Sequence, residues 1–240
     1  MKTAFRLARY HLALYVRTSR FVMQLIALIL FVAVLYSTAP AEAVSDFTLS
    51  SMVLFFLMVW VGFGTTGDPV MEQLIFLKSG SAAKQHLGEL LFLLIVAAVF
   101  GGTAVLYPVA VNFWMHGGLY KLPLTAPEAL QALALQIASA YMGGVMGWFF
   151  HPRVVGDRKL AALTALCLAV VGLVKPGIAG LWPPFAVAGY LFPPLSDVAL
   201  RLSGKTAFAF GDTAWCCGAM ILYVLALALT RWAVLVRRKY

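Results

Sequence analysis

The sequence predicts an all-α membrane protein with six transmembrane helices, in a single domain of residues 1–240. Hydrophobic residue types make up 62% of the chain and charged residues only 11%, whereas a soluble domain is about half apolar and a quarter charged. Uncharged runs long enough to cross a bilayer as a helix recur along the chain. Lipid offers the backbone no hydrogen-bond partners, so each run is expected to be helical. Six spans with short loops leave no room for a soluble catalytic domain.

Residues 1–20 are expected to form an amphipathic helix that lies at the membrane interface. The basic side chains fall within an arc of about 80° on a helical wheel, and they are Lys2, Arg6, Arg9, Arg17 and Arg20. The opposite side of the wheel carries Ala4, Leu7, Ala8, His11 and Tyr15. A basic amphipathic helix of this kind is attracted to anionic lipid. The alternative is a flexible basic tail that only fixes the topology.

The first two spans are expected within residues 21–66, as about 21–36 and 51–65. The loop between them carries Glu42 and Asp46 and no Lys or Arg. A basic start, an apolar core and a small-residue motif at 41–43 also resemble a cleavable signal peptide. Cleavage would leave five spans and an outside N-terminus. The basic region and the apolar core are both longer than usual for a signal peptide, which favours a retained first span.

Residues 67–86 form a polar interruption that is expected to hold a short helix at the cytoplasmic membrane surface. Asp68 can cap free backbone N–H groups, and Pro69 is tolerated in a first helical turn. An apolar run follows and stops at the turn residues 78–81. Two or three helical turns are too short to cross a bilayer.

Spans three to five are expected within residues 87–174, as about 87–113, 128–150 and 160–174. Glu89 falls in the first turn of span three, where a carboxylate suits the helix dipole. A short basic loop at 151–159 reverses the chain before span five.

Residues 175–212 are expected to form a broken, re-entrant or interfacial region outside the membrane core. The apolar stretch 178–195 is long enough to span, but two proline pairs interrupt it: they are Pro183 with Pro184 and Pro193 with Pro194. Trp182 and Tyr190 suit a membrane interface. The last span is expected at about 213–229, within a final segment 213–240 that ends in a basic tail counted from Arg231 onward.

The distribution of Lys and Arg predicts that both termini are cytoplasmic. With the N-terminus inside, the inside segments hold 14 basic residues and the outside segments hold 4. This asymmetry also explains the net charge of +9 without invoking nucleic acid. We therefore expect a multi-pass protein of the inner or plasma membrane.

No catalytic motif stands out. Nucleophile-elbow, zinc-protease and phosphate-binding loop patterns are absent from the sequence. His86 with Glu89, and His151 with Asp157, are the pairs that suggest metal or proton chemistry, although such pairs are more often hydrated helix ends. Glycine pairs at 101–102 and 143–144 indicate close helix packing. The three cysteines, Cys167, Cys216 and Cys217, lie in apolar runs and favour packing roles.

Together these features resemble the permease subunit of type-2 ABC exporters, the family that moves drugs, antibiotic peptides and cell-surface glycans or lipids outward. The resemblance rests on the basic helix 1–20, the six-span layout, the short helix within 67–86 and the broken segment 178–195. It implies that the short helix is a coupling helix that docks on a separate ATPase subunit. The implied coupling residues are Asp68, Glu72, Gln73, Leu74, Phe76 and Leu77.

The resemblance further implies a dimer of permeases, identical or related, with ATP and magnesium bound only by the partner ATPase. The chain itself would carry no cofactor or metal and would not be an enzyme. Its aromatic, apolar spans suit an amphipathic or hydrophobic substrate. Three other classes remain open: an integral-membrane enzyme acting on lipid, an ion-coupled secondary carrier, and an immunity or assembly protein. Scarce intramembrane charge argues against the carrier.

Overall fold

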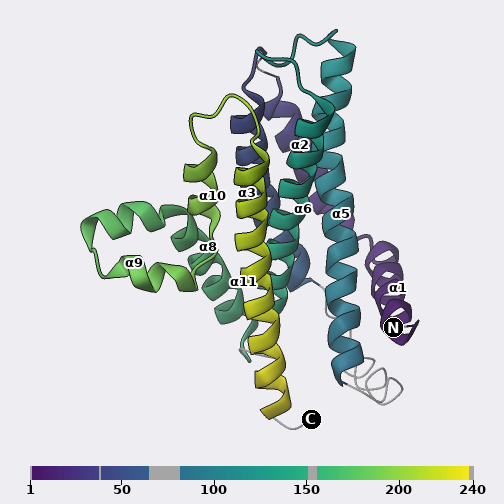
Figure 1. Cartoon of the computed structure of the whole chain (residues 1–240). Helices are drawn as coiled ribbons and strands as arrows, with labels where there is room; N and C mark the ends of the chain where they lie inside the picture. The colour runs from purple at the N-terminus through teal and green to yellow at the C-terminus, as the bar shows by residue number, and fades with distance from the viewer. Residues whose placement is uncertain (1, 38, 65–81, 151–155, 238–240) are drawn as a thin grey trace.

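The computed structural model describes residues 2–37, 39–64, 82–150 and 156–237, and these residues form a helical bundle (Figure 1). Within them the only extended pairing is an isolated bridge between Ala41 and Tyr120. The elements are α1 (Lys2–Arg17), α2 (Phe21–Leu35), α3 (Ala43–Phe63), α5 (Ala82–Trp114), α6 (Ala126–Phe149), α8 (Arg158–Leu181), α9 (Phe185–Ala188), a 3₁₀ helix (Gly189–Leu191), α10 (Leu195–Leu202) and α11 (Phe210–Arg237).

Five of these helices, α3, α5, α6, α8 and α11, are long and apolar enough to cross a membrane. This confirms a polytopic, membrane-embedded helical protein. The predicted first span corresponds to α2, which has 15 residues and is about 22 Å long, shorter than the roughly 30 Å hydrocarbon core. It passes the test for a span only together with α1, from which it is bent by 76°. The sixth span therefore stays a prediction.

Several helices extend beyond the predicted apolar spans. α3 begins at Ala43 instead of 51, after Glu42 in an extended conformation. α11 runs from Phe210 to Arg237 instead of ending at 229. α8 continues past Pro176 to Leu181, where the prediction ended it at 174. Hydropathy marks only the apolar part of a helix, whereas the backbone stays helical into its polar ends. Asp46, Asp212 and Arg231 are consequently part of long helices.

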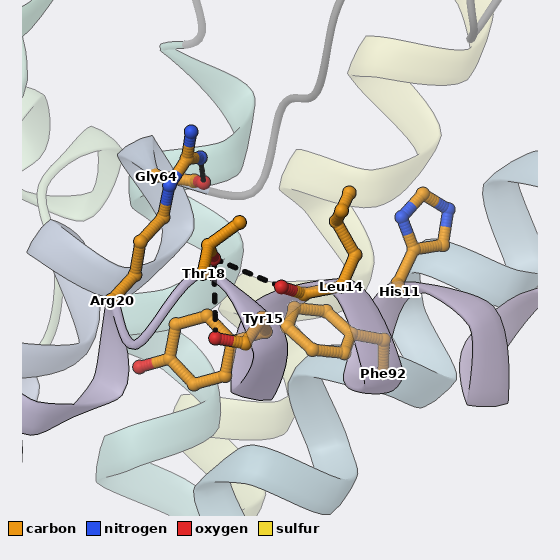
Figure 2. A pocket seen from close by; sticks show the side chains of 7 residues that line it. All are labelled: His11, Leu14, Tyr15, Thr18, Arg20, Gly64 and Phe92. Atoms are coloured by element: carbon orange, nitrogen blue, oxygen red, sulfur yellow. Dashed lines mark hydrogen bonds between the residues drawn. The ribbon is translucent and has the colours of Figure 1, made fainter.

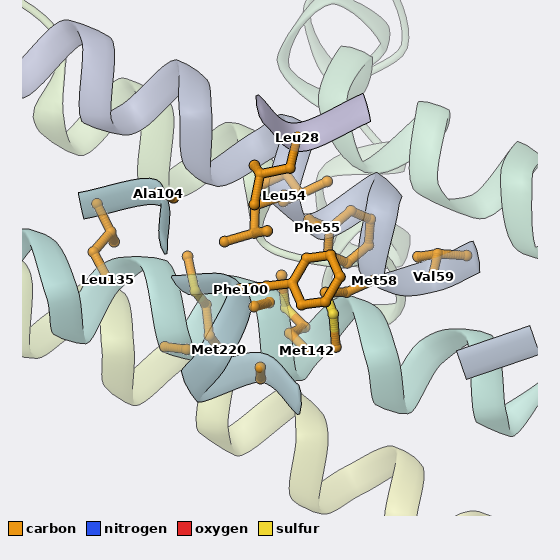
Figure 3. Close-up of a cluster of buried hydrophobic side chains, with 14 of the residues drawn as sticks. Leu28, Leu54, Phe55, Met58, Val59, Phe100, Ala104, Leu135, Met142 and Met220 are labelled. Carbon is orange, nitrogen blue, oxygen red and sulfur yellow. The ribbon is translucent and has the colours of Figure 1, made fainter. Parts of the chain in front are cut away.

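The core lies around α6, which packs against α3, α5 and α11. Figure 3 shows the side chains that fill it, contributed by several helices. Leu54, Phe55 and Met58 of α3 are fully buried, as are Leu135 and Met142 of α6. The share of each span that is buried differs greatly, from 56% for α3 and α6 to 22% for α8. α8 is therefore a peripheral helix.

Glycines allow α3 and α6 to touch through their backbones. A Cβ built on Gly143 would lie 2.2 Å from the carbonyl oxygen of Phe55, and one on Gly147 would lie 2.1 Å from that of Val59. The two glycines are four residues apart, so they line one face of α6 in the small-xxx-small pattern of membrane helix pairs. The predicted close packing at 143–144 is confirmed, and Gly101 likewise faces the backbone of α6. A Cβ built on Gly102 would meet no atom of the described residues outside its own helix within 4 Å, so that part of the prediction is wrong.

Polar side chains reinforce the same interface. The Gln136 amide donates to the Phe47 carbonyl oxygen at 2.8 Å and to Ser50 Oγ at 2.5 Å. Ser139 Oγ donates to the Ser51 carbonyl oxygen at 2.6 Å. Such bonds between membrane helices contribute about 1 kcal/mol each. α3 and α6 thus form the most tightly joined pair of the bundle.

Candidate functional site

Helix α1 packs against the first turns of α5 through the face predicted from the helical wheel. Ala4, Ala8, His11 and Tyr15 are buried. The approach is close because α5 has Gly88 there: a Cβ on this glycine would lie 2.7 Å from Leu7 Cβ. The Tyr15 ring also meets the Phe92 ring of α5 edge-on at 5.7 Å. The basic residues point away from this contact. Arg6, Arg9, Arg17 and Arg20 are all exposed. The structure describes the Lys2 backbone only, and the side chain is not among the described parts.

A small pocket lies where α1 ends beside α5 and the C-terminal end of α3 (Figure 2). Its empty space, open solvent included, amounts to about 220 Å³, and it is lined by His11, Leu14, Tyr15, Thr18, Arg20, Gly64 and Phe92. Arg20 Nη1 donates to the Gly64 carbonyl oxygen at 2.7 Å. Gly64 is the last described residue before the predicted coupling loop. The junction of α1 and α2 is therefore tied directly to the start of that loop.

A buried polar cluster joins α5, α6 and α11. Trp148 Nε1 donates to Glu89 Oε2 at 2.7 Å, and Arg231 Nη2 lies 3.6 Å from the same oxygen. The Arg231 guanidinium stacks 3.6 Å from the centre of the Trp148 ring and also donates to the Trp148 carbonyl oxygen. Only 2% of Arg231 is exposed. The cluster fixes three helices to one another through charge-assisted hydrogen bonds.

His86 completes the cluster. Its ring lies between Trp148, at 4.7 Å between centroids, and Trp232, at 5.5 Å. The sequence suggested His86 and Glu89 as a pair for metal or proton chemistry, but both side chains are committed to packing with tryptophans and Arg231. Arg231 was counted with the basic residues that follow a last span expected to end at about residue 229, whereas the structure buries it within α11. It follows an apolar run, and its distant partner Glu89 gives no local sequence signal.

The second predicted pair is not tested by the structure. His151 lies outside the described residues, and Asp157 caps α8 by accepting from the Lys159 backbone N–H at 2.7 Å. Among the described residues, no group of three His, Cys, Asp or Glu side chains is arranged to hold a metal ion. Cys216 is buried, Cys217 is partly buried and Cys167 is exposed. Their positions agree with packing roles for the first two.

The two proline pairs interrupt the helices between α8 and α10. Pro184 precedes α9, and Pro194 precedes α10. α9 forms part of a hairpin that projects sideways from the bundle (Figure 1). Its apolar side chains face outward, with Leu181 90% and Tyr190 84% exposed. The break is therefore observed, whereas re-entry into the bilayer stays a prediction.

The basic residues that were assigned to the outside form ion pairs. Lys175 pairs with Asp197, and Lys121 Nζ lies 2.8 Å from Glu42 Oε1. Arg201 Nε lies 2.7 Å from Asp212 Oδ1, and Lys205 pairs with the other oxygen of the same carboxylate. The four basic residues counted there each have an acidic partner.

The predicted coupling residues lie outside the described residues: they are Asp68, Glu72, Gln73, Leu74, Phe76 and Leu77. The described chain before them ends at Gly64, held by Arg20, and the described chain after them resumes at Ala82, six residues before Gly88, where α5 contacts α1. Comparison with protein-family models, with curated proteins and with solved structures found no match for this chain. What the chain does is therefore inferred from its own residues and their arrangement.

Proposed function

We propose that this chain is the membrane-spanning permease subunit of an ATP-driven exporter of the type-2 ABC kind. It would move an amphipathic or hydrophobic substrate, such as a peptide, a drug or a lipid-like molecule, across the inner or plasma membrane. A separate cytoplasmic ATPase would bind ATP and magnesium, and a second permease copy, identical or related, would complete the pathway. Both termini would be cytoplasmic. The chain itself would make and break no covalent bond.

The observation that best supports this proposal is that residues of the N-terminal segment 2–20 contact the chain on both sides of the 65–81 segment. Arg20 binds Gly64 at its start, and Leu7 of α1 packs on Gly88 shortly after its end. A protein that docks on this segment would therefore act on α1, α3 and α5 together. The exposed basic face of α1 is suited to sliding along anionic lipid during such a movement.

The buried cluster provides a route from this region to the rest of the bundle. α5 carries Glu89 one residue after Gly88, and Glu89 is bound by Trp148 of α6 and Arg231 of α11. A displacement of the first turns of α5 would consequently be transmitted to α6 and α11 through these contacts. Coupling through packed side chains and ion pairs of this kind is a physical route for a mechanical signal.

The packing of His86 and Glu89 disfavours the lipid-modifying enzyme. A general acid or base must be within hydrogen-bond reach of a substrate proton, whereas here both side chains are enclosed by Trp148, Trp232 and Arg231. The ion-coupled carrier remains the second candidate, because the long helices contain more buried charge than hydropathy indicated.

The test is purification of the tagged full-length protein from its native membrane in mild detergent, followed by an ATPase assay of the co-purified material. We expect a stoichiometric ATPase that is lost in Glu72→Ala and Phe76→Asp while membrane insertion is unchanged. Lys121→Ala, in the opposite loop region, is the matched control and should retain it. A solitary protein without ATPase, or ATPase binding that survives both loop variants, would overturn the proposal.

A further inference from the structure

Three arginines of α1 have no counter-charge among the residues that the structure describes. Arg6, Arg9 and Arg17 are exposed, and none of their guanidinium groups forms an ion pair or a hydrogen bond with a described residue. The four basic residues assigned to the outside, in contrast, each pair with a carboxylate, and Arg231 lies beside Glu89. The counter-charge of this face therefore comes from outside the described residues, from a ligand or from solvent ions.

The contact of α1 with α5 sets the depth of α1 in the membrane. α1 lies beside the N-terminal part of α5 (Figure 1), and the α5 span has 32 residues. A helix of that length is about 48 Å long, whereas the hydrocarbon core is about 30 Å thick. Dividing the surplus equally leaves about six residues at each end in the headgroup region. Gly88, on which α1 packs, is the sixth residue of the span that begins at Ala83. α1 therefore lies at the boundary between hydrocarbon and headgroups.

α1 runs across α5 instead of along it. On α1 the contacts described above extend from Ala4 to Tyr15, which is about 16 Å of helix. On α5 they extend only from Gly88 to Phe92, which is about 6 Å. α1 is also bent by 76° from α2. A helix that crosses a membrane span in this way lies near the plane of the membrane, as interfacial helices do.

The side chains around α1 divide into a buried side, an apolar strip and a basic side. The strip consists of Phe5 and Val16, which are 63% and 52% exposed. On a helical wheel its centre lies roughly 100° from that of the buried face, and the three arginines are centred roughly 75° further round. With the strip toward the hydrocarbon, as in other interfacial helices, the arginines lie opposite α5. They consequently point sideways into the surrounding headgroups, and the side toward water carries the exposed Thr3 and Tyr10.

We propose that Arg6, Arg9 and Arg17 bind the phosphate groups of anionic phospholipids, while Phe5 and Val16 contact the acyl chains of the same lipids. The planar guanidinium group of arginine matches a phosphate with two parallel hydrogen bonds. Three positive charges without a protein partner favour a lipid with net negative charge over one whose headgroup carries its own cation. The bound lipids would hold α1 in place against α5, as ligands of defined side chains.

This lipid site is independent of the proposed exporter function, because it needs only the position of α1 at the membrane boundary. The experiment measures thermal unfolding of the purified full-length protein in neutral detergent micelles that contain phosphatidylglycerol or phosphatidylcholine at equal mole fraction. Phosphatidylglycerol is expected to raise the Tm by a few degrees over phosphatidylcholine, because a ligand that binds only the folded state stabilises it. The difference should shrink as salt is added. Native mass spectrometry counts the phosphatidylglycerol molecules that stay bound.

The variants separate a lipid site from general electrostatic attraction. The triple variant Arg6→Gln, Arg9→Gln, Arg17→Gln should lose most of the Tm difference and of the retained lipid, and glutamine keeps the helix propensity. The corresponding triple lysine variant should keep part of both, because the charge remains and the paired hydrogen bonds are lost. The matched control removes the same charge from the basic tail, with glutamine at positions 237–239, and should behave as the wild type.

Four results would overturn the lipid site. They are equal Tm values in the two lipids without retained phosphatidylglycerol, a Tm difference that persists in the triple glutamine variant of α1, an equal loss in the tail control, and the same shift with water-soluble glycerol phosphate. The last result would assign the arginines to a soluble phosphate compound. Absence of a co-purified ATPase would contradict the exporter and would not alter these lipid measurements. If the triple glutamine variant lost a co-purified ATPase and kept its lipid preference, the arginines would belong to a protein contact instead.

Discussion

Replacing Gly143 or Gly147 by alanine should destabilise the protein through the α3–α6 contact. The added Cβ would lie 2.2 Å from the Phe55 oxygen or 2.1 Å from the Val59 oxygen, whereas ordinary contact begins at 3.4 Å. Both clashing atoms belong to backbone, so no side chain can rotate to relieve the overlap. The helices must therefore separate by about 1 Å at that point, and overpacking of this size costs about 1–3 kcal/mol. Gly143→Ala with Gly147→Ala should cost more than either change alone.

The assay is reversible unfolding in mixed detergent micelles, followed by tryptophan fluorescence and by loss of helical circular dichroism. Gly102→Ala on α5 and Gly218→Ala on α11 are the matched controls, because a Cβ at either position meets nothing within 4 Å. Alanine forms helix better than glycine by about 1 kcal/mol, so the controls should be as stable as the wild type or more stable. Equal unfolding midpoints for α6 variants and controls would refute the backbone contact between α3 and α6.

Two further predictions concern charged groups. Arg231→Ala should destabilise the protein by about 3 kcal/mol, because it leaves Glu89 buried without its cation. The same unfolding assay checks this against the exposed neighbour Leu229→Ala, and a loss no larger than that of the control would contradict it. The second prediction concerns pH: the hydrogen bond from Lys121 lowers the pKa of Glu42 below its ordinary 4.5. A lowered carboxyl pKa means that the contact stabilises the fold above that value and is lost as the pH falls through the folded-state pKa. The small stability difference between wild type and Lys121→Met should therefore be present at neutral pH and vanish in acid. A difference that is constant with pH would show that the Lys121–Glu42 ion pair does not stabilise the fold.

Hydropathy and periodicity predicted much of this fold because both depend on local sequence. Apolar runs located the five long spans, and the helical wheel of residues 1–20 identified the face that packs on α5. Glycines in an apolar run indicated the close contact of α6 with α3. The proline pairs located the break around α9. Each of these features follows from a side chain's own size, polarity or backbone preference.

What the sequence did not reveal depends on residues that are far apart in the chain. Arg231 looks like any other basic residue after an apolar span until α11 places it beside Glu89 and Trp148. Asp46 was expected in a loop, and its helical position beside Tyr36 and Tyr120 arises only when α2, α3 and the 115–125 connection meet. Hydropathy likewise ended helices too early, because polar residues at helix ends carry no apolar signal while their backbone remains helical.

The peripheral position of α8 has a consequence for how the molecule can move. Only 22% of its span is buried, compared with 56% for α3 and for α6, and its contacts are chiefly with α9, the 3₁₀ helix and α10. Displacing α8 together with its hairpin therefore breaks few packing contacts, whereas parting α3 from α6 would break the densest interface in the bundle. Regions with few buried contacts open at the lowest free energy. Large rearrangements should accordingly begin in α8 and its hairpin, with α3 and α6 as the stationary frame against which they shift.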